Sequence, residues 1–415
     1  QKRYDRYLLG QRRAPYPTLH IDRITVDVRG RTDHRVVSSR MRTRAGETLD
    51  IETLRSDLER IYATGFFRAV YFEVKTEGDE TVLHIIAEDK PWGPNYLQFG
   101  MQYSDDFLGG GSTTFSSDLL LTHLNRLGAE LTVGTSIGRE LGAEIEFYQP
   151  LAASDRAFFV LETRMSQEVR DVYENESRRA QLRVRRAQGE IDFGVRPTVT
   201  SFLSAGVGID LVDQETAIGP DSPNEDALYL VGLRAGLGVD TTDSRGFPHG
   251  GFALDVSGEY NHPTLGSDVE YHQLEAIIRE FVTLGRNTLM ITGAAGTSQL
   301  ESSVRIPSFS LGGFGTFAGY RPGRLSGRHY GRGALFYYFH ITEIADDWGN
   351  AVYLGTSIEA AGAWDNRDDI DTRHIPYGGS VFLGINTAIG PAYIAYGRAT
   401  NSSYGNIYLS LGKTF

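Results

Sequence analysis

The sequence contains no cysteine, and that absence excludes several kinds of chemistry. Without thiols there is no disulfide framework, no Cys-ligated zinc or iron–sulfur centre and no thiol catalysis. Basic residues are also few, because 41 Lys and Arg stand against 53 Asp and Glu, a net charge of −12. A nucleic-acid-binding module normally shows a basic domain or stripe, so we expect no nucleic-acid partner.

Long apolar runs are missing as well. No stretch approaches the roughly 18 consecutive apolar residues of a transmembrane helix. The missing apolar runs do not exclude a membrane β-barrel, because polar and apolar residues alternate along its strands and their hydropathy averages out. The chain begins at Gln1 and shows no signal-peptide segment, so we expect a processed or truncated part of a longer protein.

Glycine and aromatic residues are the abundant types. The 48 glycines make up about 12% of the chain, against an average of about 7%, and they accompany 22 Tyr and 21 Phe. This combination favours strands joined by many turns. The composition changes near residue 92, where a mixed helix and strand pattern gives way to strand and turn patterns alone.

The first part of the chain begins with a linker and one strand. Residues 1–18 are basic, interrupted by proline and aperiodic, which is typical of a linker. The apolar pattern of 19–28 then predicts a strand that ends at Gly30. Thr32 or Asp33 suits the N-cap of a short helix that extends to residue 41.

A second helix and two further strands follow. Asp50 is a good N-cap, apolar residues recur at spacings of three and four through 51–62, and Gly65 ends the pattern. The segments 66–74 and 82–87 then read as strands joined by a turn. The order β-α-α-β-β predicts a small α+β domain.

The segment 19–91 resembles a POTRA domain, the periplasmic module that precedes certain outer-membrane barrels. The matching features are the run LERIYATGFF at 58–67 and the exit AEDKP at 87–91. An unrelated α+β domain is the alternative interpretation.

From residue 92 the chain repeats an alternating stretch followed by a turn or polar loop. We count about sixteen strands, each with the roughly 9–11 residues that cross a bilayer in a barrel. Clear examples lie at 131–137, 143–148, 227–233 and 252–260. A soluble β-sandwich shows the same alternation, so periodicity alone does not decide between the two folds.

Three observations favour the barrel. Glycines fall within strands, where they suit curvature or close packing: Gly355, Gly384 and Gly397. Acidic residues sit deep in strands on one parity, as in a water-filled lumen: Glu144, Glu146 and Glu359. The last strand carries one apolar parity and an aromatic end: Ile407, Leu409, Leu411 and Phe415.

Here the resemblance becomes specific. The segment DTTDSRGFPHG at 240–250 matches the turn of POTRA-linked outer-membrane barrels through Asp240, Asp243, Pro248 and Gly250. LGGFGTFAGYRPG at 311–323 resembles their sixth extracellular loop, and SIEAAGAW at 357–364 resembles the strand motif that this loop meets. The resemblance implies an all-β fold, a barrel of sixteen antiparallel strands over 92–415 after one POTRA domain. A lid loop, about 305–333, would fold into the lumen, in the bacterial outer membrane.

With a single POTRA domain, the chain is most similar to the C-terminal part of the patatin-like secreted phospholipases, the type Vd autotransporters. That resemblance implies a translocator that exports or presents a passenger fused before Gln1. The lipase serine of such a parent would also lie there, so we expect no enzyme activity and no cofactor in this chain. The alternatives are an assembly factor or two-partner secretion transporter for a separate protein, or a passive porin. A porin needs no POTRA domain, and general assembly factors usually carry several.

The same resemblance names the partners. They are outer-membrane lipid and lipopolysaccharide, the passenger polypeptide and the barrel-assembly machinery. The resemblance also permits a homodimer.

The lid departs from the family pattern at one position. Most relatives carry an arginine directly before the Gly-Tyr pair, facing an acid on the barrel wall, whereas this chain has Ala318. We therefore predict that Arg321 or Arg324 reaches Glu359 instead. The residues expected to lock the lid are Gly319, Tyr320, Arg321, Arg324 and Glu359.

A protein that passes polypeptide needs a place to catch an extended chain and a pore or seam that opens. The edge strand 66–74 offers the first, because backbone pairing at a sheet edge tolerates many sequences. Its expected contact residues are Phe66, Phe67, Val70 and Phe72. The seam between the first barrel strand and the last, 405–415, offers the second together with the lid.

Three patterns look like catalytic or metal sites. GTSIG at 134–138 matches Gly-x-Ser-x-Gly, but that motif works at a strand-to-helix turn and Ser136 lies in an alternating strand. The ten histidines show no His-Glu-x-x-His spacing, so we expect no metal. The acidic loop 365–371 suits either a divalent cation or a solvated loop facing lipopolysaccharide, since it lacks the glycine and distal glutamate of a calcium loop.

One arginine cluster flanks a strand and permits two interpretations. Its members either line the lumen and help solvate a passing chain, or belong to a salt-bridged barrel wall. They are Arg178, Arg179, Arg183, Arg185 and Arg186.

Overall fold

The computed structural model describes residues 19–90, 95–107, 111–174, 177–219, 227–300, 309–342, 349–387 and 389–412. The chain forms two compact units, an N-terminal unit that includes Thr122–Ala129 and Ala152–Ser154, and a barrel unit. Among the described residues, no helix has both the length and the apolar character needed to cross a membrane.

The N-terminal unit contains a three-stranded sheet and two helices, in the β-α-α-β-β order that the sequence predicts. Its elements are β1 (His20–Ile21), β2 (Arg23–Arg29), α2 (His34–Ser38), β3 (Glu47–Thr48), α3 (Ile51–Tyr62), β4 (Phe67–Glu77) and β5 (Glu80–Asp89). The strand order is β2-β5-β4, with β2 parallel and β4 antiparallel to β5. Because β5 is central, β2 and β4 are the two edges of this sheet.

Both helices begin at aspartate N-caps. Asp33 accepts a hydrogen bond from the Arg35 N–H at 2.8 Å, and Asp50 accepts one from the Glu52 N–H at 3.2 Å. The side-chain bond to Arg35 lowers the pKa of Asp33, and the Thr53 hydroxyl, followed by the Glu52 N–H, lowers that of Asp50. Of the two predicted caps for α2, Asp33 is therefore the one used.

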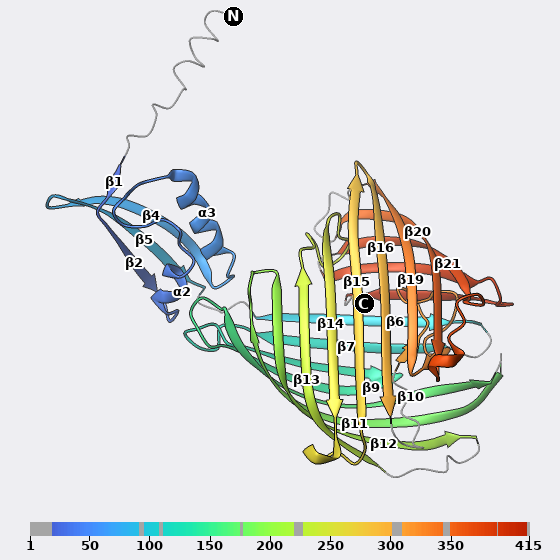
Figure 1. Ribbon diagram of the computed structural model, residues 1–415. Coiled ribbons are helices and arrows are strands. Elements are labelled where there is room, and N and C mark those ends of the chain that lie inside the picture. Colours follow the sequence, from blue (N-terminus) through green and yellow to red (C-terminus); the bar gives the residue numbers. More distant parts are fainter. Residues whose placement is uncertain are drawn as a thin grey trace, which may run out of the picture. The chain divides into compact units, whose positions relative to one another are not determined.

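The two helices lie beside the sheet (Figure 1), and their apolar residues pack with those of the strands in one core. The fully buried members include Val36, Val37, Leu54, Ile61, Leu83 and Ile85. Helix α2 ends at Ser38, short of the predicted residue 41, because the chain turns toward α3. There the buried Asp57 accepts hydrogen bonds from the N–H groups of Arg42 at 2.9 Å and Thr43 at 2.8 Å.

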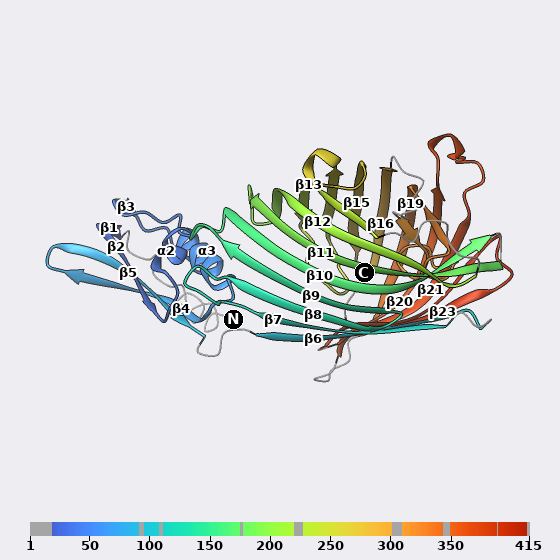
Figure 2. The same ribbon diagram turned by 90° about the horizontal axis from the view of Figure 1, so that it is seen from below.

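The barrel unit is a closed antiparallel barrel of sixteen strands, as the alternation predicts. Its strands are β6 (Tyr96–Asp105), β7 (Ser112–Leu121), β8 (Glu130–Gly138), β9 (Glu140–Pro150), β10 (Ala157–Glu174), β11 (Ser177–Val195), β12 (Ser201–Ile218), β13 (Leu228–Asp240), β14 (Gly251–Asn261), β15 (Tyr271–Leu284), β16 (Asn287–Leu300), β19 (His329–Thr342), β20 (Gly349–Trp364), β21 (Tyr377–Thr387), β22 (Gly390–Ala399) and β23 (Gly405–Leu411). Two short 3-10 helices, η1 (Pro263–Leu265) and η2 (Arg367–Asp369), lie in loops. Strands β6 to β12 run side by side in Figure 2. A closed sheet excludes the sandwich.

The two faces of the wall differ as the sequence predicts. On β20, Ile358 is 69% exposed while its neighbour Glu359 is only 1% exposed. Glu144 lies on the inner parity of β9 and pairs with Arg164 at 2.6 Å, whereas the adjacent Ile145 is 50% exposed. Period-two alternation therefore separates an apolar outer face from a charged lumen.

The seam that closes the barrel is its shortest pairing. Among the described residues, β23 and β6 share five register pairs, from Ile407 opposite Asp105 to Leu411 opposite Met101. The next shortest pairings, β22 with β23 and β8 with β9, have seven each. Fewer ladder hydrogen bonds hold the seam than any other part of the described wall.

Candidate functional site

The lid is the segment 309–327, which folds as a small hairpin of β17 (Phe309–Leu311) and β18 (Leu325–Gly327). Its tip is compact, since the Gly313 N–H donates to the Tyr320 carbonyl at 2.8 Å. Gly313 has φ +97°, a left-handed conformation that favours glycine. Phe317 and Ala318 at the tip are completely buried. The tip is therefore packed against inward-facing residues of the barrel wall.

Glu359 holds the lid through its main chain. One carboxylate oxygen accepts a hydrogen bond from the Ala318 N–H at 2.5 Å, and the other accepts one from the Ser357 hydroxyl at 2.5 Å. The prediction that Arg321 or Arg324 reaches Glu359 is wrong. The backbone at position 318 comes so close to the wall that a Cβ on Gly397 would lie 2.3 Å from the Ala318 carbonyl oxygen. A main-chain N–H therefore occupies the position that an arginine was expected to take.

The two arginines have other partners. Arg321 forms a salt bridge with Asp106 at 3.0 Å, and both side chains are largely buried. Asp106 is the residue directly after β6. The Arg324 guanidinium lies over the Tyr320 ring at 5.8 Å, a cation–π contact.

The lid also binds the last strand. The Tyr408 hydroxyl lies 3.0 Å from the Ala318 carbonyl oxygen and 2.8 Å from that of Tyr320, and donates to these acceptors. The Asn406 amide donates to the Gly319 carbonyl at 3.1 Å. Since Asp106 adjoins β6 and these residues belong to β23, the lid is attached to both sides of the seam.

Two further arginines support the lid from the wall. Arg332 on β19 donates to the Gly315 carbonyl at 2.8 Å, and Arg139 donates to the Pro322 carbonyl at 3.2 Å. Position 319 must be glycine, because a Cβ there would lie 2.6 Å from the Ala399 backbone nitrogen. The expected lid residues thus gather at one place, although with different partners from those predicted.

The turn 241–250 contains the predicted motif in an ordered form. Asp240 accepts a hydrogen bond from the Thr242 N–H at 2.9 Å, and Asp243 accepts one from the His249 N–H at 2.9 Å. The Pro248 carbonyl accepts a hydrogen bond from the Tyr338 hydroxyl. A side chain at Gly250 would meet nothing within 4 Å, so packing does not require that glycine.

The turn also inserts Phe247 into the lumen, which the sequence did not predict. Its ring stacks on Tyr353 at 4.5 Å, and a Cβ on Gly384 would lie 2.3 Å from it. No motif or periodic pattern signals this contact, because Phe247 and Gly384 lie far apart in the sequence. Phe247 belongs to a buried cluster with Phe336, Tyr338 and Phe382.

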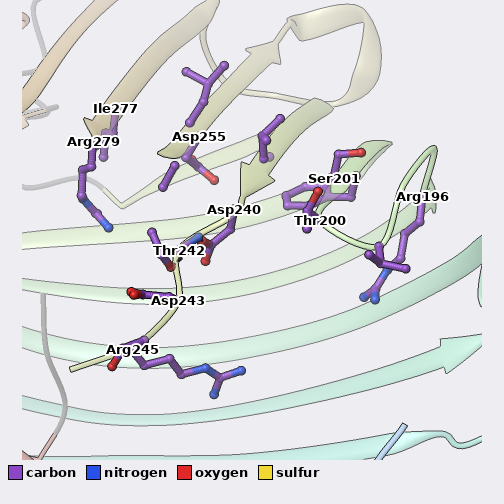
Figure 3. A pocket seen from close by; sticks show the side chains of 17 residues that line it. Arg196, Thr200, Ser201, Asp240, Thr242, Asp243, Arg245, Asp255, Ile277 and Arg279 are labelled. Atoms are coloured by element: carbon purple, nitrogen blue, oxygen red, sulfur yellow. Dashed lines mark hydrogen bonds between the residues drawn. The ribbon is translucent and has the colours of Figure 1, made fainter. Parts of the chain in front are cut away.

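A cavity of about 880 Å³ opens beside this turn (Figure 3). Three acids and three arginines line it: Asp240, Asp243, Asp255, Arg196, Arg245 and Arg279. Arg279 extends toward the part of the turn that carries Thr242 and Asp243. This mixed-charge surface resembles a hydrated passage more than a pocket for one small molecule.

The expected contact edge of the N-terminal unit is only partly available. β4 is an edge strand, but Phe67 is completely buried and Phe66 is 9% exposed, because both pack in the core. Val70 also packs against that core, whereas Phe72 is 39% exposed. Phe66 stacks on His123 within the same unit at 4.7 Å. Phe66 and Phe67 therefore cannot offer their side chains to a partner.

The other singled-out residues are placed as follows. Ser136 lies inside β8 and no helix follows it, so the strand-to-helix turn of a nucleophile elbow is missing there. Ile407, Leu409 and Leu411 share one face of β23, and Phe415 lies outside the described residues.

The arginine cluster belongs mainly to the salt-bridged wall. Arg185 pairs with Asp213 and Glu215 at 3.0 Å each, and Arg183 pairs with Glu215. Both arginines share the outward parity of the 58%-exposed Phe193. The interpretation that they line the lumen is wrong for these two. Arg186 has the opposite parity, and its guanidinium lies 4.0 Å from the Asp210 carboxylate. Arg179 is also part of β11, whereas the side chain of Arg178 is not among those that the structure describes.

No group of histidine, aspartate and glutamate suited to a metal ion occurs within the described ranges. In the loop 365–376, the Asp371 carboxylate contacts His374 at 2.6 Å, and this hydrogen bond lowers the pKa of Asp371. The Asp369 carboxylate accepts from the Asn366 amide at 2.7 Å. These two acids are thus engaged within their own loop.

A closed sixteen-stranded barrel with an inward lid, preceded by a small α+β domain, defines a class of outer-membrane polypeptide transporters and assembly proteins. Residues 124–415 match the Omp85 superfamily domain, and the protein belongs to that superfamily. A search of curated proteins finds no match. The membership places the barrel in the bacterial outer membrane and the POTRA domain in the periplasm.

Solved structures share the fold. BamA from Haemophilus ducreyi lacking POTRA domains 1–3 is 15% identical, with a TM-score of 0.69 over 95% of this chain and 85% of that chain. CdiB from Acinetobacter baumannii is 11% identical, with a TM-score of 0.58 over 95% and 74%. CdiB from Escherichia coli is 11% identical, with a TM-score of 0.60 over 94% and 77%.

Proposed function

We propose that the chain is the translocator of a passenger polypeptide fused before Gln1, and that this passenger is a patatin-type phospholipase. The superfamily to which the chain belongs contains outer-membrane translocators and assembly proteins. The fused passenger is supported by the sequence resemblance of both the small α+β domain and the barrel. On this proposal the chain itself performs no catalysis.

Capture of the passenger takes place at β4. Among the described strands, β4 pairs only with β5, and an extended segment adds to such an edge as a further strand. Side chains near the middle of the strand, Phe72 and Val74, are 39% and 36% exposed. They provide apolar contact, while backbone pairing keeps the capture tolerant of sequence.

One observation carries the transport step: the lid is bonded to both strands of the shortest pairing in the described wall. Arg321 holds Asp106 beside β6, while Tyr408 and Asn406 of β23 hold the carbonyls of the lid tip. Leaving the lumen breaks all of these bonds, and the seam then depends on five register pairs. Displacement of the lid therefore clears the lumen and weakens the seam together.

Engineered disulfides test the opening of the seam. Gln102 on β6 lies opposite Ser410 on β23, and paired positions of antiparallel strands have the spacing that a disulfide requires. The chain has no native cysteine to interfere. The matched control joins Ser116 on β7 to Ser136 on β8, within the wall.

The assay follows a reporter passenger fused before Gln1 and its accessibility to protease added outside the cell. We expect Gln102→Cys/Ser410→Cys to block exposure when oxidised and to restore it on reduction, while Ser116→Cys/Ser136→Cys has no effect. Export that continues with the seam locked would show that the seam does not open. A separate protein, but not the fused reporter, reaching the surface or the membrane would instead support the alternative of a two-partner transporter or assembly factor.

A further inference from the structure

A second, smaller cavity of about 310 Å³ lies behind the lid. Its walls come from the lid, from the turn 241–250, and from β15, β16, β19, β21 and β22. Most of the lining is aromatic or aliphatic, including Phe281, Met290, Phe314, Phe336 and Phe382. This volume is at the lower limit for small-molecule sites, which are typically about 300–1,000 Å³.

The charged residues of this chamber all have the same sign. Arg245, Arg279 and Arg332 line it, and no aspartate or glutamate does so among the described residues. Arg245 and Arg279 also line the larger cavity, so they stand at the boundary between the aromatic chamber and the hydrated passage. An apolar chamber with a cationic mouth is complementary to a molecule with an anionic head and an apolar body.

Asp240, Asp243 and Asp255 line the larger cavity together with Arg245 and Arg279, and the first two have other hydrogen-bond donors. Asp240 accepts from Thr242 and Asp243 accepts from His249. Glu359 accepts from Ala318 and Ser357, and Glu275 accepts from the Tyr330 hydroxyl at 2.6 Å.

Arg279 is the arginine with the most free donor capacity. Among the described residues its guanidinium makes no hydrogen bond or salt bridge, although Asp240 lies within electrostatic reach. It extends toward the turn that borders the mouth (Figure 3). Arg332, by comparison, donates to the lid carbonyl of Gly315. A guanidinium has five N–H donors in a fork that matches a carboxylate or phosphate.

We propose that this chamber binds a single-chain anionic amphiphile, with its head on Arg279 and its aliphatic chain among the aromatic residues. A carboxylate or a phosphate head satisfies the same donors. The chamber lies inside the barrel and is too small for a two-chain phospholipid, so the ligand is a free amphiphile and not a lipid of the surrounding bilayer. Because Phe314 and Thr316 of the lid line the chamber, the ligand contacts the lid and the wall together.

The test measures binding of dodecanoate to the whole chain in an uncharged detergent by isothermal titration calorimetry. We expect Arg279→Gln to weaken dodecanoate binding about tenfold, as loss of a charged hydrogen bond does. Arg286→Gln is the matched control, since Arg286 is exposed in the tight turn between β15 and β16 and does not line the chamber. Thr292→Phe fills the chamber without changing its charge and should abolish dodecanoate binding.

Heat-modifiable migration in gels shows that each variant has a folded barrel before binding is compared. Saturable binding of dodecanoate, with weak binding of neutral dodecanol and of two-chain phosphatidylglycerol, supports the proposal. Equal binding of dodecanoate by wild type and Arg279→Gln would overturn it, as would binding of dodecanol or phosphatidylglycerol as strong as that of dodecanoate. Loss of binding in Arg286→Gln would also overturn it, because the effect would then follow overall charge.

Discussion

The Glu359 carboxylate accepts a hydrogen bond from the Ala318 N–H at 2.5 Å, so a wall side chain holds the lid through its backbone. Both groups are buried, with Glu359 1% exposed and Ala318 completely covered. Burial removes competing water, so loss of the acceptor leaves a buried donor unsatisfied. The strength of this contact decides how readily the lid leaves the lumen.

The first prediction concerns this bond. Glu359→Ala should loosen the lid by roughly 1.5–3 kcal/mol, the usual value of a hydrogen bond to a charged group, and raise pore conductance in planar bilayers. Glu359→Gln keeps an acceptor oxygen and should have a smaller effect. Glu146→Gln, at another acidic position of the barrel wall, serves as the control. Conductance that does not change in Glu359→Ala would show that other contacts hold the lid.

The second prediction concerns the salt bridge between Arg321 and Asp106. Removing one partner of a buried salt bridge typically costs about 3–5 kcal/mol. Arg321→Ala and Asp106→Ala should each lower the urea midpoint of barrel unfolding. The double variant should lose less free energy of unfolding than the two single variants lose in sum. Arg164→Gln, which breaks the exposed lumenal pair with Glu144, should cost about 1 kcal/mol or less. Additive losses would show that the two residues act independently.

Within the N-terminal unit, Asp57 should be the most sensitive acid. It is completely buried and accepts hydrogen bonds from Arg42, Thr43 and Arg60. Asp57→Ala leaves these donors unpaired, so we expect amides of 19–90 to exchange with solvent at least tenfold faster, about 1.4 kcal/mol or more. The control is Glu59→Ala, because its pair with Arg55 is exposed and typically contributes less than about 0.5 kcal/mol. Equal exchange in the two variants would contradict this expectation.

Acid should open the helix N-termini of the N-terminal unit. The folded-state pKa values of Asp33 and Asp50 lie below those of the unfolded chain, so their contribution is present above the unfolded pKa of about 3.9. It is lost as the pH falls through the folded pKa values. Hydrogen exchange at the start of α3, corrected for its intrinsic pH dependence, should therefore rise below about pH 4. Asp50→Asn keeps the cap without the titrating group and should remove this rise; a rise of the same size in that variant would assign it to another group.

Ser136 should have no catalytic role. It lies in the interior of β8 opposite Gly142 of β9, and the strand-to-helix turn that activates such a serine is missing there. We expect no hydrolysis of p-nitrophenyl esters by this chain, and no difference in Ser136→Ala beyond a small change in stability. Ester turnover that disappears in the alanine variant would assign a nucleophile to this strand.

The alternation of the barrel was predictable because it is local. Successive side chains of a strand point to opposite faces, so Ile358 lies outside and Glu359 inside independently of the rest of the chain. Asp50 marks the start of α3 for the same reason, since an N-cap depends on neighbouring residues. The other end differs slightly from the prediction, because α3 ends at Tyr62 with Ala63 as its C-cap, two residues before Gly65. The partner of Glu359 was not predictable in this way. It is a backbone N–H, which every residue except proline carries, so no residue type signals it.

The position of Phe247 shows a second limit of the sequence. The ring needs the space left by Gly384, which lies on a strand more than a hundred residues later. Only the closed barrel brings the two together. The Arg321–Asp106 pair likewise depends on β6 and β23 meeting at the seam. Contacts that rely on closure lie outside what a motif or a periodic pattern expresses.

The barrel wall binds the lid through the carbonyls of Gly315, Ala318, Gly319, Tyr320 and Pro322. Every amino acid supplies a carbonyl, so these five bonds depend on the path of the lid backbone and not on its side chains, in contrast to the Arg321–Asp106 salt bridge. The lid sequence is therefore free to diverge at positions with room for a side chain, and is restricted where Cβ atoms would collide, as at Gly319. Loops exchanged between distant barrels should then close a foreign pore when they reproduce this backbone path and also supply a cation for the Asp106 carboxylate.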